Sequence, residues 1–252
     1  MDNVFDKMYY GRGQLIGGID ESGVCDIAGP LVAACVVLPK IDLKKDDLKI
    51  FDVNDSKKIP EKYRKHYAEI IWQSAVGIGI GEVQPFEIDY LGQQIATRLA
   101  MLRAVAACRG TANSKKVIVP DYLMVDGDVG LETTISQLTI VRGDSKSLSI
   151  AAASIVAKVY RDEIMINLHE KYPVYDWDHN KGFPSDKHLS GLDEHGVVVG
   201  VHRTKYWPFA KHPKHQDDLR GWSRRRTRWR RLTERRLGAE LGEAVWDSRP
   251  RT

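Results

Sequence analysis

Short apolar runs alternate with longer amphipathic segments along the first 210 residues. Apolar runs bounded by turn residues are typical of strands, and segments with apolar residues at every third or fourth position are typical of helices. The predicted strands occupy residues 15–38 (two strands and a tight turn), 75–83, 122–126 and 137–141. The predicted helices cover residues 60–71, 85–110, 148–168 and 185–195. This order predicts an α/β fold in which helices flank a mixed sheet.

Acidic residues stand at the ends of three of these apolar runs. Asp20 and Glu21 close the first run, Asp126 closes another, and Asp144 follows a third. Side chains alternate along a strand, so Asp20 and Glu21 converge if the strand ends there and the chain turns. Clustered carboxylates repel one another unless a cation lies between them. The interpretation that competes with a metal site is that each acid is a solvated turn residue.

Oxygen ligands of this kind favour hard divalent cations. Two such ions, roughly 3.5 to 4 Å apart, suit the in-line attack of water on a phosphodiester. Four carboxylates would balance the charge of two divalent ions. The acids therefore predict a metal-dependent hydrolytic site at the strand ends.

Composition limits the class of protein. The sequence has no apolar run of about 18 to 20 residues, so we expect no membrane-spanning helix. Residues 1–7 are mixed in charge and lack the apolar core of a signal peptide, and we expect a cytoplasmic protein. The three cysteines lack zinc-ligand spacing, which favours reduced thiols.

Charge divides the chain into two parts. The net charge is +4, yet residues 211–252 hold 13 lysines and arginines against 6 acidic residues, so the rest of the chain is slightly acidic. We predict one domain over residues 1–209 and a basic, Arg/Trp-rich C-terminal extension over residues 210–252. Three interpretations of the extension stay open: a nucleic-acid clamp, which we favour, an amphipathic membrane-surface or partner helix, and a dispensable segment.

Several short motifs occur in an order and spacing that resemble the ribonuclease HII family, the type 2 ribonucleases H, over residues 13–209. They are GIDE at 18–21, AGPLVAA at 28–34, DSKK at 55–58, VDG at 125–127, GDSK at 143–146, IAAASIVAK at 150–158, RD at 161–162, NKGFPS at 180–185, HL at 188–189 and HR at 202–203. Each motif alone is weak, and together they are highly specific.

The resemblance implies a ribonuclease H-like fold with a mixed five-stranded sheet and a helical C-terminal part, so that residues 1–209 form the catalytic domain. It implies an endonuclease that hydrolyses the RNA strand of RNA–DNA hybrids with Mg²⁺ or Mn²⁺, leaving 5′-phosphate and 3′-hydroxyl ends. The partner would be such a hybrid, or a DNA duplex containing ribonucleotides, and we expect a monomer. Carried over by position, the catalytic residues and metal ligands are Asp20, Glu21, Asp126 and Asp144.

The sequence departs from the family at the loop after the first strand, where the family usually has Asp-Glu-x-Gly-Arg-Gly. Gly23 is kept, Val24 replaces the arginine and Cys25 replaces the second glycine. In the family, the backbone of this loop holds the ribonucleotide at an RNA–DNA junction through its 2′-hydroxyl. Val24 removes a cation that could meet a phosphate, and we expect Cys25 to resist a positive φ. Hydrolysis is still expected, with weakened incision at embedded ribonucleotides.

Further substrate contacts follow from the same resemblance. Ser56, Lys57 and Lys181 lie in motifs that imply contact with the nucleic acid, and Phe183 replaces a tyrosine that packs on a sugar. Phe183 keeps the stacking face and loses the hydroxyl. With Gly23, Val24 and Cys25, these residues make up the predicted substrate-binding set.

Other functions and roles stay open at this point. The histidines are candidates for proton transfer, although a structural role is favoured; they are His188, His195 and His202. The alternatives to a hybrid-cutting enzyme are a non-cutting hybrid-binding module and a ribonuclease H-like nuclease of other specificity. Four intact acids speak against the binding module, because pure binding gains nothing from carboxylates that repel phosphate.

Overall fold

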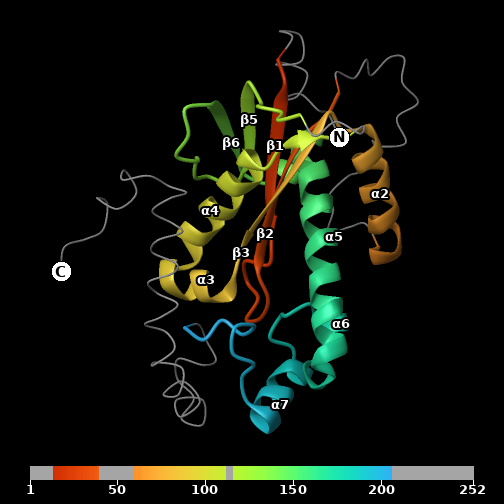
Figure 1. Cartoon of the computed structure of the whole chain (residues 1–252), viewed down its shortest axis with the longest axis vertical. Coiled ribbons are helices and arrows are strands. Elements are labelled where there is room, and N and C mark those ends of the chain that lie inside the picture. Colours follow the sequence, from red (N-terminus) through yellow and green to blue (C-terminus); the bar gives the residue numbers. More distant parts are fainter. Residues whose placement is uncertain (1–13, 40–59, 112–115, 206–252) are drawn as a thin grey trace, which may run out of the picture.

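A computed structural model of the chain describes residues 14–39, 60–111 and 116–205. Within these ranges, six strands form one mixed sheet in the order β4-β3-β2-β1-β5-β6 (Figure 1). The strands are β1 Ile16–Ser22, β2 Leu31–Val37, β3 Gly77–Val83, β4 Arg109–Gly110, β5 Tyr122–Asp126 and β6 Ser136–Ile140. The prediction of a mixed α/β sheet is confirmed, and β4, a two-residue strand, adds a sixth member to the five expected strands.

The sheet changes direction beside β1. Strands β1 to β4 pair antiparallel in sequence order, whereas β5 runs parallel to β1 and β6 runs parallel to β5. The carboxyl ends of β1, β5 and β6 therefore lie along the same edge. This is the edge at which the sequence carries its acids.

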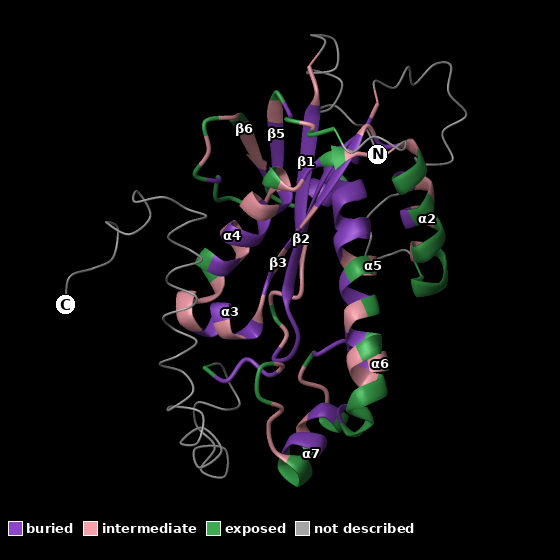
Figure 2. Cartoon of the chain, in the orientation of Figure 1, coloured by how far each residue is buried: buried purple, intermediate pink, exposed green. Residues whose placement is uncertain are grey.

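Helices cover both faces of the sheet. On one face, α4 packs against β1, β2 and β3, and on the other face α5 packs against β1 and β2 with α2 beside it. Every residue of β2 is buried, as Figure 2 shows for the centre of the sheet. The helices are α2 Glu61–Ser74, α3 Pro85–Leu91, α4 Gln93–Ala106, α5 Leu148–Lys171, α6 Trp177–Asn180 and α7 Asp186–His195, with short 3₁₀ helices η1 Gly143–Ser145 and η2 Pro173–Tyr175.

The close approach of α5 to β1 depends on Gly18. A Cβ atom at Gly18 would lie 2.0 Å from the carbonyl carbon of Ser149, which is too close for any side chain. Because the helix backbone lies directly on the strand here, the next turn of α5 brings Ser154 to the carboxyl end of β1. The glycine therefore helps to position the candidate site.

The prediction of one helix over residues 85–110 is wrong. Gly92 has a φ of +80° and separates α3 from α4. A capping box between Gln84 and Glu87 fixes the start of α3. The apolar periodicity continues across the break, so the sequence pattern alone did not separate the two helices.

The predicted helical C-terminal part is confirmed for the described residues. The end of α5, η2, α6 and α7 pack around Trp177, whose ring stacks on Tyr175 with centroids 4.8 Å apart. No described helix is both long and apolar enough to cross a membrane. The predicted extension over residues 210–252 lies outside the described residues.

Candidate active site

Asp20 and Asp126 lie side by side at the carboxyl ends of two parallel strands. The residues before them, Ile19 and Val125, pair across β1 and β5 and pack into the apolar cluster beneath α4. Because side chains alternate along a strand, Asp20 and Asp126 point to the opposite face, which α5 covers. The structure thus brings together two of the four predicted acids.

Strand β1 does not end at its two acids, so the prediction that it ends there is wrong. Glu21 still pairs with Ala33, and Ser22 with Val32. A regular strand directs neighbouring side chains to opposite faces, which turns Glu21 away from the face of Asp20. The chain turns two residues after Glu21, at Gly23, where φ is +94°.

A backbone hydrogen bond ties the fourth predicted acid to this edge. The N–H of Gly143 donates to Oδ1 of Asp126 at 2.6 Å. Gly143 begins η1, and the next residue, Asp144, is only 7% exposed. The hydrogen bond holds the start of η1 against the end of β5, so Asp144 lies at the same edge as Asp126.

The charge of Asp20 is poorly compensated. Burial raises the pKa of Asp20 well above its usual value, and the negative charges of Glu21 and Asp126 raise it further. Hydrogen bonds from the Ser154 hydroxyl and from the N–H of Glu21, the latter at 2.8 Å, act in the opposite direction. The neighbouring charges that act on this pKa are both negative, and a bound cation would relieve their repulsion.

The donor set fits a hard divalent cation. Four carboxylates offer the oxygen ligands that Mg²⁺ and Mn²⁺ prefer. Within the described residues, no three of the four carboxylates have ligand oxygens that all lie within 4.8 Å of one another. Mutual repulsion favours such a spacing, and a cation would draw the oxygens together. The role of each acid as a ligand stays a prediction.

The loop after β1 carries Val24 and Cys25 in place of the family's arginine and glycine, without the backbone strain expected at Cys25. Cys25 is not among the described residues with positive φ, so the expected conflict at this position does not arise. Cys25 is exposed and Val24 is half-buried, and both line a cavity together with Pro184. The loop therefore accommodates Cys25 with a negative φ.

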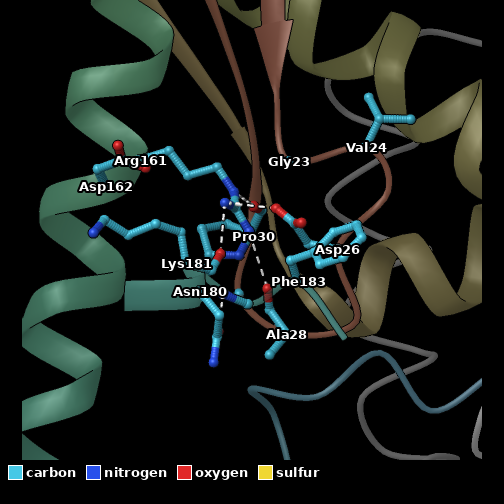
Figure 3. Close-up of polar contacts among 12 residues, drawn as sticks. Gly23, Val24, Asp26, Ala28, Pro30, Arg161, Asp162, Asn180, Lys181 and Phe183 are labelled. Atoms are coloured by element: carbon cyan, nitrogen blue, oxygen red, sulfur yellow. Dashed lines mark hydrogen bonds and ion pairs between the residues drawn. The ribbon is translucent and has the colours of Figure 1, made fainter. Parts of the chain in front are cut away.

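A buried arginine from α5 organises this loop (Figure 3). The guanidinium of Arg161 donates to the carbonyl oxygens of Pro30, Lys181 and Ala28 at 2.9 to 3.0 Å. It also forms an ion pair with Asp26, at 2.7 Å between Nη1 and Oδ2. Arg161 thus links the loop after β1 to the loop after α6.

A second buried arginine, Arg203, reinforces the same loop. It donates to the carbonyl oxygens of Gly23 at 2.6 Å, Gly29 at 3.0 Å and Pro30 at 3.1 Å. Both arginines are 1% exposed. A Cβ at Gly23 would lie 2.1 Å from Nε of Arg161, so this glycine is required by packing as well as by its φ.

Sequence reasoning assigned no role to Arg161 or Arg203, although both stand in motifs that carry the family resemblance. The available signal was their position. Arg161 follows the nearly apolar first half of α5, where a charged side chain needs partners.

The remaining predicted substrate contacts differ in accessibility. Phe183 is 53% exposed and its ring is free to meet a ligand. Lys181 is only 7% exposed; its Nζ pairs with Glu61 at 3.0 Å and contacts the carbonyl oxygen of Asp178. Ser56 and Lys57 lie outside the described residues.

Two of the three candidate histidines form a buried network that supports a structural role. The indole N–H of Trp177 donates to Nε2 of His188 at 3.0 Å, so the other ring nitrogen of His188 carries the hydrogen and donates to the carbonyl of Phe183 at 2.9 Å. His202 accepts the N–H of Val198 at 2.8 Å. Burial lowers the pKa of His188, which favours the neutral ring. His195 lies at the end of α7.

Comparison with known proteins gives a consistent picture. A family model described as Ribonuclease HII matches residues 17–207. Ribonuclease HII of Caldanaerobacter subterraneus subsp. tengcongensis is 42% identical over 203 residues, which cover 80% of this chain and 78% of that protein. The family match spans most of the domain predicted over residues 1–209.

Solved structures share the fold. The ribonuclease H2 of Pyrococcus horikoshii OT3 superposes with a TM-score of 0.63 at 22% identity, covering 78% of this chain and 95% of that chain. Ribonuclease HII of Archaeoglobus fulgidus, solved in complex with PCNA, gives a TM-score of 0.60 at 24% identity, covering 75% and 93%. Bst-RNase HIII in complex with Mn²⁺ gives 0.55 at 17% identity, covering 84% and 72%.

Proposed function

The chain belongs to the ribonuclease HII family and is a ribonuclease H enzyme, and we propose that it hydrolyses the RNA strand of RNA–DNA hybrids with Mg²⁺ or Mn²⁺ as cofactor. The products would be 5′-phosphate and 3′-hydroxyl ends. The observation that carries the proposal is the pair Asp20 and Asp126, which lie on one face of the sheet and whose mutual repulsion raises the pKa of Asp20. A related structure that holds Mn²⁺ supports the choice of metal.

Asp20, Asp126 and Asp144 would hold the cations together with Glu21, whose side chain would turn toward them from the other face of β1 when the cations bind. When bound, two divalent ions would activate the attacking water and stabilise the leaving oxygen. The Gly143 N–H fixes the orientation of Asp126, and the N–H of Glu21 with the Ser154 hydroxyl fixes that of Asp20. All four acids come from one chain, which is consistent with action as a monomer.

The nucleic acid would lie across the loop after β1 and the loop after α6. Backbone groups near Glu21 and Gly23 would contact the 2′-hydroxyl, because that group distinguishes RNA from DNA at a given position. Phe183 would stack on a sugar, and the predicted contacts Ser56 and Lys57 would face phosphates. Lys181 would do so after its ion pair with Glu61 opens. Arg161 and Arg203 are positioning residues, because their donors are used on backbone carbonyls of these loops.

The altered loop supports a preference for continuous hybrids over single embedded ribonucleotides. Val24 offers no hydrogen bond to phosphate, and Cys25 places a side chain where the family has glycine. Contacts spread along a continuous RNA strand depend less on one junction. We therefore propose that long hybrids are the better substrate.

The deciding experiment compares three end-labelled duplexes of one sequence: a continuous RNA–DNA hybrid, a DNA duplex with one ribonucleotide, and an all-DNA duplex. We expect cleavage of the hybrid in Mg²⁺ or Mn²⁺, weaker cleavage at the single ribonucleotide, none of the DNA duplex, and full loss of cleavage in chelator. Cleavage of the all-DNA duplex would indicate a nuclease of other specificity. Binding of the hybrid without cleavage in Mn²⁺ would instead establish the non-cutting module.

A further inference from the structure

A second group of potential metal ligands lies outside the sheet, around α6. Asp176, Asp178 and His179 form the one group of three or more in the described part of the chain whose ligand atoms all lie within 4.8 Å of one another. From the last turn of α5, His169 brings a further imidazole to Asp178, with Nδ1 3.1 Å from Oδ1. We propose that Asp176, Asp178 and His179 bind a transition-metal ion, with Zn²⁺ as the best-matched one, and that His169 supports the site through its contact with Asp178.

Two separations among the three ligand atoms are close to those of tetrahedral coordination. Bonds of about 2.0 to 2.1 Å from zinc to nitrogen or oxygen place tetrahedral ligand atoms roughly 3.3 Å apart. Nδ1 of His179 lies 3.0 Å from Oδ1 of Asp178 and 3.2 Å from Oδ1 of Asp176. Both separations between nitrogen and oxygen fall just below this value.

Hydrogen bonds among the residues around α6 leave some of their acceptor atoms unsatisfied. The Nδ1 atom of an imidazole carries at most one hydrogen, yet Nδ1 of His179 faces two carboxylate oxygens. Nδ1 of His169 and Oδ1 of Asp178 are both shielded from solvent, and the 3.1 Å contact between them does not have the geometry of a hydrogen bond. A cation at the centre would satisfy lone pairs that the available hydrogens leave over.

The surroundings hold the ligands and leave access for an ion. Trp177 is fully buried between Asp176 and Asp178, so it anchors α6 while its neighbours face outward. The side chain of His179 is 73% exposed. Lys187 places its Nζ 3.4 Å from Oδ1 of Asp176, but this lysine is 74% exposed and is free to swing away. Imidazole with carboxylate suits zinc, whereas Mg²⁺ prefers oxygen ligands alone.

Calorimetric titration of Zn²⁺ into the full chain tests the site directly. Excess Mg²⁺ in the buffer competes for the acids at the strand ends, and the variants below assign the remaining Zn²⁺ binding to α6. We expect one Zn²⁺ site whose affinity falls about tenfold or more in both His179→Gln and Asp178→Asn. The matched control, His66→Gln on the exposed side of α2, should bind Zn²⁺ as the parent does. Lys187→Ala should bind it more tightly, because a competing cation is removed.

A second measurement guards against misfolded variants. Zn²⁺ should raise the melting temperature of the parent and of His66→Gln, and not that of His179→Gln. Equal Zn²⁺ affinity in the parent, His179→Gln and Asp178→Asn would overturn the site, as would the absence of Zn²⁺ binding to the parent in excess Mg²⁺; an ion-pair cluster would then be its sole role. Neither readout involves RNA cleavage, so failure here leaves the proposed nuclease activity untouched.

Discussion

Two carboxylates, the buried Asp20 and the half-buried Asp26, lie six positions apart and differ in the charges around them. Burial raises the pKa of each. At Asp20 the charges of Glu21 and Asp126 raise it further. At Asp26 the nearby cations Arg161, Arg203 and Lys158 oppose the effect of burial.

The difference separates a structural charge from a functional one. The protein supplies the counter-charge of Asp26 itself, through a direct ion pair with Arg161. At Asp20 the described charges with the largest effect, Glu21 and Asp126, are negative, and a cation bound from solution would supply the counter-charge. This contrast is the physical reason for expecting a cation at the end of β1 and a fixed framework in the loop that follows it.

The largest expected effect is on the rate of cleavage, when an acid of the candidate active site is removed. Asp126→Asn should lower the rate of hybrid cleavage by about 10³-fold or more, because loss of a metal ligand removes several kcal/mol of transition-state stabilisation. The asparagine oxygen can still accept from the Gly143 N–H, so the fold should persist. Cleavage and hybrid binding would be measured on the same labelled duplex.

Binding by Asp126→Asn should remain close to that of the parent, since the carboxylate itself repels phosphate. Asp128→Asn, two residues further along the exposed chain, is the matched control and should cleave normally. Cleavage by Asp126→Asn at the parental rate, in buffer stripped of metal and then restored, would exclude this aspartate as a ligand.

Removing the ion pair between Asp26 and Arg161 should lower folding stability. Arg161→Met should lower the free energy of unfolding by about 3 to 5 kcal/mol, because it leaves Asp26 buried without its partner. Asp26→Asn should cost less, since it removes the charge while Arg161 keeps its carbonyl acceptors. Urea unfolding followed by circular dichroism compares the two.

A double variant, Asp26→Asn with Arg161→Met, sharpens the test. If the ion pair dominates, the double variant should be more stable than the sum of the two single losses predicts. Strict additivity would mean that the carbonyl contacts of Arg161, and not its pairing with Asp26, hold the loop.

How far the sequence predicts these features depends on how local their causes are. The strands and the acids at their ends follow from short apolar runs, and the structure has the strands where the pattern predicts them. Convergence of Asp20 with Asp126 needed only the pairing of two strands. The contacts of Arg161 were beyond prediction, because it reaches Ala28 across 133 sequence positions and bonds to backbone atoms, which any residue type offers.

Local detail also limited the prediction where one residue decides between two structures. Gly92 interrupts a helix whose apolar periodicity continues unchanged. At Glu21, backbone pairing with β2 persists past the acids, and nothing in the residue types reveals where pairing stops. At α6, Asp176, Asp178 and His179 are close in sequence, so their proximity could have been predicted. The contact of His169 with Asp178 depends on how α5 and α6 pack, which the sequence pattern does not reveal.

Restoring the family motif tests whether recognition, unlike metal binding, has been altered in this chain. Val24→Arg combined with Cys25→Gly should raise cleavage at a single ribonucleotide relative to a continuous hybrid by about tenfold, the worth of one charge-assisted hydrogen bond to phosphate. Val24→Met with Cys25→Gly has similar bulk without the charge and serves as the control. An equal gain in both variants would assign the effect to the glycine.

The smallest expected effect is on the free energy of unfolding, which the buried charge of Asp20 lowers. In metal-free buffer near neutral pH, Asp20→Asn should raise the free energy of unfolding by about 1 kcal/mol. Point substitutions usually change stability by about this amount, but most of them lower it. Asparagine keeps an acceptor for the Glu21 N–H and removes the buried charge. Urea unfolding would be measured with and without Mg²⁺.

The pH dependence of this difference identifies its cause. The pKa of Asp20 is raised in the folded state, so between its unfolded value and its folded value the folded chain binds more protons, and stability falls as pH rises through that window. The advantage of Asp20→Asn should therefore be absent below about pH 4, grow as pH rises, and level off once the folded carboxylate is ionised. Saturating Mg²⁺ should reverse the order, since binding stabilises the parent more than the variant. An advantage that is constant with pH would point to packing, and the charge of Asp20 would then need no external cation.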